Sequence, residues 1–436
     1  MASTESAEDL TDEELRKLLM PDPTVEQVVD AIRQSFVQDS AADIQVIKEL
    51  DSYDDKNVWI SINGTNYLAK VHNGVESKDL MDRLVEGDKI ASTAFTSSSI
   101  HLQNAMMIHL NQHGIATNQP QEAVQTADTR LPTPGAVHSL PVKSKDHSPY
   151  PLVVRLLGWV PGRPMSSFPM LPIEALANAG IFLGKLSTCL SKLPSDQLQA
   201  AKRYHQWDGK NTMDLRDFVH YIDDSRKRSM VESVIDAFQT ELIDSKVAES
   251  SFSKSLIHAD FNDANFLLDD SFRISGVIDF GDSVESWRIL DLSVALAYSL
   301  ITVYGKQDRS LSAAAAMLRG YNSVCPLTEV ERKHLLLLMA CRLSCSVTLG
   351  AYSYKQNPEN EYLLLHSGPG WNALDLIWGT DPTRRASMKT IIDGLFDRAC
   401  SKSFPVDGET TPIDCSDLAF PDPSLEDPLA AARGKF

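Results

Sequence analysis

The stretch IHADFNDANFLLDDSFRISGVIDFGD, residues 257–282, carries the strongest structural signal in this sequence. It places an acid, an amide and a second acid at fixed offsets, namely Asp260, Asn265 and Asp279. The apolar run ISGVI leads directly into the second acid and is typical of a buried strand. We therefore expect two short strands, near residues 265–268 and 273–278, to present the three side chains from one side.

Phosphoryl transfer is a reaction that needs this set of side chains. One carboxylate must position a hydroxyl group and accept its proton, and further oxygen ligands must hold Mg²⁺. A hard cation prefers carboxylate and amide oxygens to His or Cys. We expect Asp260 to be the catalytic base, and Asn265 and Asp279 to be the Mg²⁺ ligands. The alternative is a chance combination of loop residues, which the fixed order and the apolar strand before Asp279 make less favourable.

The same segment resembles a known group of enzymes. Its order, His-x-Asp-x₄-Asn followed by Ile-Asp-Phe-Gly-Asp, resembles the catalytic and metal-binding segments of protein kinases. It is closer still to the aminoglycoside-phosphotransferase group of small-molecule kinases, which share the kinase-like fold. Only eleven residues separate Asp279 from the helix expected near Asp291. No activation segment for a protein substrate fits into that interval.

Within that group, the sequence resembles the hydroxylysine kinases. The similarity covers roughly residues 24–378 and leaves both acidic ends outside. The segments that carry it, in the expected order, are SYDDKN (52–57), YLAKV (67–71), LQNAMM (102–107), VVRLLGWVPGRP (153–164), HADFNDANFL (258–267), SGVIDFGD (275–282), PEN (358–360) and GW (370–371). The resemblance implies 5-hydroxy-L-lysine as acceptor and GTP as phosphoryl donor with Mg²⁺, although no residue distinguishes GTP from ATP.

The resemblance also implies an α+β, two-lobed, protein-kinase-like fold, with a small antiparallel-sheet N-lobe and a larger, mostly helical C-lobe. A length of 436 residues favours two lobes over one core. We expect an acidic N-terminal extension over residues 1–23, the N-lobe with its nucleotide-binding sheet over 24–160, and the C-lobe with the catalytic and metal loops over 161–403. The acidic, proline-containing tail over 404–436 is predicted to be disordered.

Local patterns predict the elements of the N-lobe. Thr24 and Gln27 form a capping box before apolar residues at helical spacing. Two alternating runs around Asn63-Gly64 predict a hairpin. Residues 79–110 are expected to be mostly helical, and residues 117–149 to form a long surface connection around a weak strand or two. The run YPLVVRLLGWV, residues 150–160, is predicted to be a strand.

The C-lobe is predicted to be mainly helical. The expected helices span residues 173–193, 212–222, 225–244, 287–304, 309–320, 327–354, 370–378 and 385–400.

The resemblance assigns the donor nucleotide to N-lobe residues. Lys70 would contact the α- and β-phosphates, and its alternative is a solvent-facing strand lysine. Ser52 and Tyr53 lie where related kinases have a glycine-rich loop; the segment has no glycine, so a plain turn is equally consistent with it. Backbone groups of Leu157 and Trp159 would hold the base at the hinge between the lobes, although these residues also fit a buried core strand.

Supporting residues follow from the same resemblance. His258 would hydrogen-bond the loop around Asp279. Asp291 would anchor the loop that carries Asp260, called the catalytic loop from here on, with helix capping as the alternative. His101 occupies the position where the family has a glutamate that pairs with the phosphate-binding lysine. Glu86 or another acid would take that role, or Lys70 is held differently. Ala259 stands where these kinases often have Gly.

The acceptor implied by the resemblance has charges that require matching groups. Hydroxylysine carries a carboxylate and two ammonium groups, with a net charge of about +1 at neutral pH. Asp282 and Glu285 could meet the ammonium groups. Arg342 lies in an apolar helix where an unpaired charge is costly, so it could bind the carboxylate, or it could pair with a structural acid. Trp371 could wall the pocket or be a core residue.

Composition narrows the class of partner and the compartment. The net charge is −18, concentrated at the two ends, and no basic stripe suggests nucleic acid. The six cysteines form no CxxC pair and no zinc spacing, which favours reduced thiols. With no signal-like amino terminus and no uncharged run of membrane-span length, we expect a cytoplasmic protein without a membrane partner. The sequence leaves the oligomeric state open.

Three other functions remain open on the sequence. The chain could phosphorylate another small alcohol, such as homoserine, a choline-like amine or a sugar. It could be a pseudokinase that binds nucleotide without turnover, an alternative that His101 supports. It could also be an interaction protein that works through its acidic ends.

Overall fold

The computed structural model describes residues 12–85, 98–124, 136–143, 149–193, 200–303, 310–356, 367–402, 404 and 413–419. Its internal contacts divide the chain into two compact units. The first unit comprises Met1–Val160 with Leu193–Lys202, and the second comprises Pro161–Lys192 with Arg203–Phe436.

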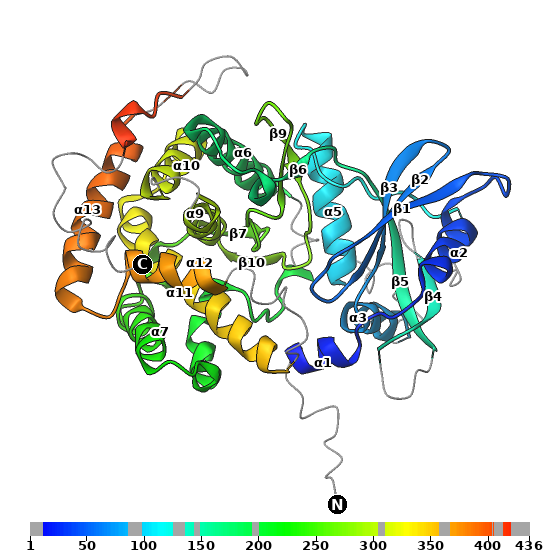
Figure 1. Ribbon diagram of the computed structural model, residues 1–436, viewed down its shortest axis with the longest axis horizontal. Coiled ribbons are helices and arrows are strands. Elements are labelled where there is room, and N and C mark those ends of the chain that lie inside the picture. Colours follow the sequence, from blue (N-terminus) through cyan, green and yellow to red (C-terminus); the bar gives the residue numbers. More distant parts are fainter. Residues whose placement is uncertain are drawn as a thin grey trace, which may run out of the picture. The chain divides into compact units, whose positions relative to one another are not determined.

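Within its described residues, the first unit is built on an antiparallel sheet of five strands in the order β1-β2-β3-β5-β4 (Figure 1). The strands are β1 (Ile44–Leu50), β2 (Lys56–Ile62), β3 (Thr65–Val71), β4 (Ala136–Pro141) and β5 (Pro149–Gly158). The predicted hairpin is confirmed: Asn63 (φ 49°) and Gly64 (φ 82°) form the turn between β2 and β3. Positive φ at both central residues is what a two-residue hairpin turn of this twist requires.

Helix α2 (Val25–Phe36) packs on one face of this sheet, and α3 (Gly74–Val85) and α5 (Ser99–Gln112) pack on the other, while α1 (Asp12–Leu18) contacts α3. The predicted capping box of α2 is present, with Thr24 and Gln27 exchanging side-chain and backbone hydrogen bonds. The apolar face of α2 packs with Val58 and Ile60 in one core, and Ile100 of α5 packs with Val153 in a second core. Figure 1 shows α2 and α5 on opposite sides of the sheet. Because Ile32 of α2 is fully buried, Ile32→Ala would cost about 2–5 kcal/mol.

The helical prediction over residues 79–110 is confirmed for the described residues, which belong to α3 and α5; residues 86–97 lie outside them. Residues 117–149 were expected to be a surface connection around a weak strand or two. The strand β4 lies there, and residues 119–121 also pair with β5. The backbone N–H of Gln121 donates to the Leu156 carbonyl (2.9 Å), and that of Gly158 donates to the Gln119 carbonyl (2.7 Å). The polar composition concealed this main-chain pairing.

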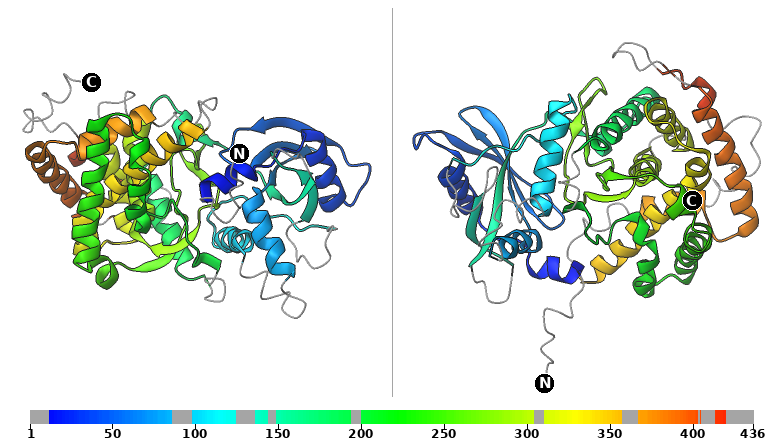
Figure 2. Two further views of the ribbon diagram at one scale, coloured as in Figure 1. Left: turned by 90° about the horizontal axis from the view of Figure 1, so that it is seen from below. Right: turned by 180° about the vertical axis from the view of Figure 1, so that it is seen from behind.

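The second unit is mainly helical, as predicted (Figure 2). Its α-helices are α6 (Ile173–Leu190), α7 (Ser225–Phe238), α8 (Val247–Ser251), α9 (Ile289–Val303), α10 (Ser310–Val324), α11 (Glu329–Gln356), α12 (Ser367–Ile377) and α13 (Pro382–Cys400). Residues expected as a helix over 212–222 instead form the 3₁₀ segments η4 (Gly209–Asp217) and η5 (Val219–Tyr221), because aromatic and polar residues there do not sustain a helical apolar face. The helix expected over 225–244 ends at Phe238 and continues as a π-helical turn.

Two small sheets interrupt the helices and carry the 257–282 stretch. The strands β8 (Phe266–Leu268) and β9 (Ile274–Val277) pair in antiparallel fashion, as expected, and β6 (Arg163–Pro164) joins them. The second sheet, β7 (Lys254–Ile257) with β10 (Val284–Trp287), was not predicted. In the sequence, β7 precedes the catalytic and metal segments and β10 follows them, while β8 and β9 lie between them. Gly162 allows the close approach, since a Cβ there would lie 2.8 Å from the Leu268 carbonyl oxygen.

The C-terminal tail is a further correction. Residues 413–419 are not disordered: Ile413, Cys415 and Leu418 are buried, and Asp417 pairs with the fully buried Arg319 of α10. The Arg319 guanidinium donates to both carboxylate oxygens of Asp417, at 2.6 and 2.9 Å. The composition of the tail predicted disorder because composition does not reveal its anchor, Arg319, which is almost a hundred positions upstream of Asp417. Apart from Phe404, the rest of the tail lies outside the described residues.

Two described helices are long and apolar enough to cross a membrane by length and composition, namely α6 and α11. Their apolar windows are 61% and 83% buried inside the structure, as in the core helices of soluble proteins. Burial in the helical unit therefore accounts for their composition, and the expectation of no membrane partner stays a prediction.

Candidate active site

The hairpin of β8 and β9 brings the amide and the second acid to one end of the same strand pair. Phe266 pairs with Val277, and the backbone N–H of Ile278 donates to the carbonyl of Asn265 (3.1 Å). Asn265 and Asp279 therefore flank the buried strands at the same end. The apolar residues of both strands fill the core, so the polar residues just outside them are held in place.

The first acid lies in direct contact with the amide. The Asn265 side-chain N–H₂ donates to both the backbone carbonyl and the Oδ2 atom of Asp260, each at 2.9 Å. Asn262, which was not among the predicted site residues, donates to the same Oδ2 atom at 2.8 Å. Its own Oδ1 accepts the backbone N–H groups of Ala264 (2.8 Å) and Asn265 (3.1 Å), which closes the loop. Asp260 and Asn265 thus form one hydrogen-bonded unit.

Asp279 approaches the same place with an unusual backbone conformation. Its φ is 62°, and Ala259 on the catalytic loop has a φ of 67°. Such left-handed conformations cost a non-glycine residue about 1–3 kcal/mol and concentrate at functional sites. Burial raises the pKa of Asp260, and the charges of Asp282 and Asp279 add to the rise while Arg342 opposes it. Asp279 and Asp282 therefore each act on the ionisation of Asp260.

A clamp of hydrogen bonds fixes the catalytic loop. Asp291, in the first turn of α9, accepts the backbone N–H groups of His258 (2.9 Å) and Ala259 (2.7 Å). The His258 ring is fully buried, and its Nε2 donates to the Ile278 carbonyl (3.0 Å). With Nε2 as the donor, Nδ1 accepts the Asp260 N–H at 3.3 Å. The two side chains thus join α9, the catalytic loop and the residue before Asp279.

Arg342 makes a contact that neither alternative for it anticipated. It is a buried residue of α11, and its Nη2 donates to Asp260 Oδ1 at 2.5 Å. The guanidinium lies over the rings of Trp207 (5.1 Å) and Tyr298 (5.4 Å). The acid that pairs with Arg342 is thus the predicted catalytic base itself.

Asp282, one of the two acids predicted to meet the ammonium groups of the acceptor, pairs with His205. The His205 Nε2 atom lies 3.1 Å from Asp282 Oδ1. Burial acts to raise the pKa of Asp282, but His205 together with the charges of Arg342 and Arg203 holds that pKa well below its usual value. Arg203 donates to the Gly281 carbonyl at 2.5 Å and holds the loop from the other side. Neither His205 nor Arg203 was predicted, because they lie in an irregular segment without a motif.

The same irregular segment is fixed to β10 by a buried acid. Asp208 accepts the hydroxyl of Ser286 at 2.7 Å, and Lys210 pairs with its other oxygen at 2.9 Å. Lys210 also donates to the backbone carbonyl of Glu285 at 3.3 Å. The predicted substrate role of the Glu285 carboxylate stays a prediction.

Trp371 lies on α12 and is 8% exposed. The ammonium of Lys227 lies over its ring, 5.0 Å from the centroid. This placement fits the core alternative, and the pocket-wall role stays a prediction.

In the first unit, Lys70 is buried rather than solvent-facing. Its Nζ lies 2.6 Å from Asp55 Oδ2, and Asp55 Oδ1 accepts the backbone N–H of Asn73 (2.8 Å). Asp55 belongs to the SYDDKN segment between β1 and β2, together with the half-buried Ser52 and Tyr53. Asp55 is thus an acidic partner of Lys70, where Glu86 or another acid was expected. Glu86 lies outside the described residues.

The helix α5, which carries His101, is joined to the sheet by amides. Arg155 of β5 is buried and donates to Asn104 Oδ1 (2.6 Å) and Gln103 Oε1 (2.6 Å) on α5. Its Nε donates to His72 Nε2 at 2.7 Å. Burial, followed by the charges of Arg155 and Lys70, holds the pKa of His72 well below its usual value, so the ring accepts this bond as neutral imidazole.

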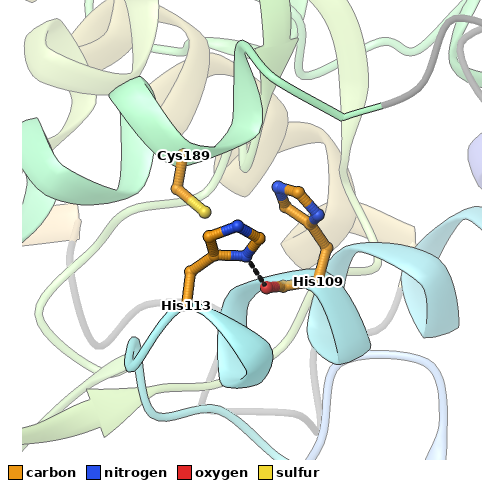
Figure 3. Close-up of side chains that lie close together, drawn as sticks. All are labelled: His109, His113 and Cys189. Carbon is orange, nitrogen blue, oxygen red and sulfur yellow. Dashed lines mark hydrogen bonds between the residues drawn. The ribbon is translucent and has the colours of Figure 1, made fainter.

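Figure 3 shows the carboxyl end of α5. The His113 Nδ1–H donates to the His109 carbonyl at 2.8 Å, and the two rings lie 4.3 Å apart. His113 caps the helix, so this pair has a structural role in the first unit.

Two indole rings lie beside the predicted base-binding residues. Trp59 of β2 and Trp159 stack with their centroids 4.2 Å apart and an angle of 10° between the planes. The strand register places Trp59, Leu68 and Leu157 in one row across the sheet, on the face that also carries Lys70. The indole N–H of Trp59 is buried and has no acceptor among the described residues.

The donor set at the end of β8 and β9 fits a hard divalent cation. The Asn265 amide nitrogen points to Asp260, which leaves its oxygen available, and Asp279 adds carboxylate oxygens. Oxygen donors of this kind are those that Mg²⁺ prefers. The residues present therefore fit the ion that the sequence predicts.

Comparisons with known proteins agree with this geometry. The model of a family described as the phosphotransferase enzyme family matches residues 46–332. A hydroxylysine kinase of Danio rerio is 27% identical over 376 residues, covering 84% of this chain and 95% of that protein. A hydroxylysine kinase of Bos taurus is 28% identical over 341 residues, covering 76% and 84%. Among solved structures, amicoumacin kinase hAmiN has a TM-score of 0.54 at 15% identity, covers 91% of this chain and 97% of its own, and shows a common fold.

Proposed function

The chain belongs to the phosphotransferase enzyme family, and on this premise we propose that it transfers the γ-phosphoryl group of GTP to the hydroxyl of 5-hydroxy-L-lysine. It is a small-molecule kinase that acts on an alcohol group. The observation that carries the proposal is the hydrogen-bonded unit of Asp260 and Asn265 at the end of the buried β8 strand.

Asp260 is the proposed catalytic base. Its carboxylate would orient the acceptor hydroxyl and take its proton as the oxygen attacks the γ-phosphorus. Asn265 and Asp279 would hold Mg²⁺, which when bound neutralises charge on the phosphoryl oxygens. Asp291 and His258 act on the base indirectly, since their hydrogen bonds fix the loop that carries it.

The donor nucleotide is proposed to bind to the first unit. Lys70 would steady the α- and β-phosphates, with its Nζ held in place by Asp55. Backbone groups of Leu157 and Trp159 would face the base, and Ser52 and Tyr53 would lie near the phosphates. GTP is proposed from the resemblance to hydroxylysine kinases, and ATP is the alternative donor.

The acceptor is proposed from the relatives and from the charges of the site. Two hydroxylysine kinases align with most of this chain. Asp282 is held ionised and can meet an ammonium group, while Arg342 offers a guanidinium beside the base. An acceptor with both charges and a hydroxyl is an amino acid of the hydroxylysine type.

The pseudokinase alternative loses its main support. It depended on His101 standing where the family has a glutamate. Asp55 supplies a carboxylate to Lys70 at 2.6 Å from another element of the same unit, so the lysine keeps an acidic partner.

A panel assay tests the proposal. The purified full chain is incubated with Mg²⁺, GTP or ATP, and 5-hydroxylysine, homoserine, choline or a hexose, and nucleoside diphosphate formation is followed. The proposal predicts the highest kcat/KM for 5-hydroxylysine with GTP. Preferred turnover of a hexose or choline would contradict it, and so would nucleotide binding with no turnover on any acceptor.

A further inference from the structure

The carboxylate of Asp260 has a hydrogen-bond donor on each oxygen. Arg342 Nη2 donates to Oδ1 at 2.5 Å. Asn262 and Asn265 donate to Oδ2 at 2.8 and 2.9 Å. Because Oδ2 already accepts two donors, an acceptor hydroxyl that hands its proton to Asp260 must approach Oδ1, where it competes with Arg342. Arg342 is the donor that comes from a different element, α11, and so it can leave without opening the catalytic loop.

Arg342 uses only part of its guanidinium for this contact. In the planar guanidinium, Nε and Nη2 form one edge, which is the fork that binds a carboxylate through two parallel hydrogen bonds. Asp260 engages Nη2 of that edge, while Nε is buried and has no acceptor among the described residues. A buried N–H group without an acceptor is unfavourable and marks a place where a ligand oxygen can bind.

The surroundings of Arg342 keep the guanidinium at the site. It is 5% exposed, and the rings of Trp207 and Tyr298 lie 5.1 and 5.4 Å from its central carbon. The aromatic faces attract the cation, and Nη1 donates to the Trp207 carbonyl at 3.5 Å. These contacts leave the Nε–Nη2 edge out, so the guanidinium can exchange one carboxylate for another at that edge and keep them.

We propose that the carboxylate of the acceptor takes the Nε–Nη2 edge of Arg342 and thereby releases Asp260 to act as base. The acceptor class is then hydroxyl-bearing amino acids, and amino alcohols without a carboxylate are poor substrates. This inference rests on the proposed phosphotransfer to an amino acid. A two-point contact with the acceptor replaces the one-point contact with Asp260, which is why the exchange is favourable.

The released base completes a balanced transfer. The acceptor oxygen forms a bond to the γ-phosphorus, and the bond from that phosphorus to the β,γ-bridging oxygen breaks. The hydroxyl proton passes to Asp260, and the nucleoside diphosphate leaves with the bridging oxygen. Without an acceptor, Arg342 holds Asp260 Oδ1, so activation of water and hydrolysis of the nucleotide are suppressed.

The experiment compares acceptors that differ only in the carboxylate. 5-Hydroxylysine is paired with its decarboxylated form, 1,5-diaminopentan-2-ol, and homoserine with 3-aminopropan-1-ol. For the wild-type chain we expect kcat/KM to be about 10- to 100-fold higher for the member of each pair that carries the carboxylate. This is the range expected for a charge-assisted hydrogen bond. Both Arg342→Lys and Arg342→Gln should reduce this ratio towards one.

A second readout separates this role from a structural one. Nucleotide hydrolysis without an acceptor should rise severalfold in Arg342→Gln relative to wild type, because Asp260 is no longer held. Lys355→Gln, on the exposed end of the same helix, is the matched control and should leave both readouts unchanged. Arg342→Lys keeps the charge but not the fork, and so tests the proposal if the Gln variant does not fold.

The outcomes distinguish this inference from the proposed function. Equal wild-type turnover of both members of an accepted pair would overturn the inference and leave the kinase activity intact. Full preference for the acid in a folded Arg342→Lys chain would also overturn it. Turnover of homoserine but not hydroxylysine, with the carboxylate preference retained, would contradict the proposed acceptor and support the inference.

Discussion

Asp55 and Lys70 form a buried ion pair, with 2.6 Å between Oδ2 and Nζ, in which a loop residue takes the role expected of a helix residue. The first prediction is that Asp55→Asn destabilises the chain by about 3–5 kcal/mol, because removal of one partner leaves a buried charge. It should also weaken nucleotide binding, since Lys70 loses its orientation. Urea unfolding and calorimetric nucleotide titration measure the two effects.

The matched control for this prediction is Glu49→Gln. Glu49 of β1 pairs with Lys56 of β2 at 2.7 Å in the same sheet but is half exposed. Exposed ion pairs contribute little to stability, so we expect little change in the free energy of unfolding or in nucleotide binding. Similar effects of both substitutions would contradict a special role for Asp55.

The second prediction concerns the strained residue of the catalytic loop. Ala259 has a φ of 67°, which a glycine adopts without the steric cost. The relief of strain and the greater freedom of glycine in the unfolded chain oppose each other. We therefore expect Ala259→Gly to keep activity and to change the free energy of unfolding by no more than about 1 kcal/mol.

The control is Ala264→Gly on the same loop, where φ is not positive and no strain is relieved. Its free energy of unfolding, measured by chemical denaturation, should be about 1 kcal/mol lower than that of Ala259→Gly. The opposite order of stability would mean that the left-handed conformation at residue 259 is not strained.

The third prediction is a pH dependence of the tail anchor. The hydrogen bond from Arg319 lowers the pKa of Asp417 below its usual value. A lowered folded-state pKa gives stability that is present above the unfolded-state pKa and is lost as the pH falls through the folded-state value. Asp417→Asn should therefore destabilise the chain clearly at pH 7, and the difference from wild type should shrink below about pH 4.

Denaturant unfolding at a series of pH values measures this difference. Asp270→Asn, in the exposed pair with Arg163, is the control and should show no such pH dependence. A destabilisation by Asp417→Asn that grows as the pH falls would contradict the assignment.

The fourth prediction tests the stacked indoles as part of the nucleotide site. Trp59 shares its sheet face with Lys70 and has a buried N–H without an acceptor among the described residues. We expect Mg-GTP to quench the tryptophan fluorescence. Trp59→Phe should raise the nucleotide KM about tenfold, because about one stacking or hydrogen-bond contact is lost. The acceptor KM should change little.

Trp378→Phe is the control, because Trp378 lies in the second unit and bonds to Ser233. This variant should keep the quenching by nucleotide. If Trp59→Phe quenches as wild type does, the indole pair lies away from the nucleotide.

The parts of the molecule that local sequence determines were predictable. Asp260, Asn265 and Asp279 lie within one short stretch, and the buried strands between them fix their positions. The Asn63-Gly64 hairpin and the Thr24 cap also depend only on neighbouring residues. In each case the interaction that defines the structure lies inside the pattern itself.

The contacts between distant segments were not predictable. Arg342 reaches Asp260 from 82 residues away, and Arg319 anchors Asp417 over 98 residues. His205 lies in an irregular segment whose residues form no period or motif. Nothing in the local sequence specifies these partners, because the packing of helices decides which side chains meet.

The most direct test of the central claim is the product formed by wild-type and Asp260→Asn chains from Mg-GTP and 5-hydroxylysine. Phosphorus NMR of the wild-type reaction should show a phosphate monoester of hydroxylysine, with one nucleoside diphosphate released per ester. Asp260→Asn should bind nucleotide normally but form the ester at least about 100-fold more slowly. An ester formed at the wild-type rate by the Asp260→Asn chain, or no ester from the wild-type chain, would contradict the assignment of Asp260 as the base of a hydroxylysine kinase.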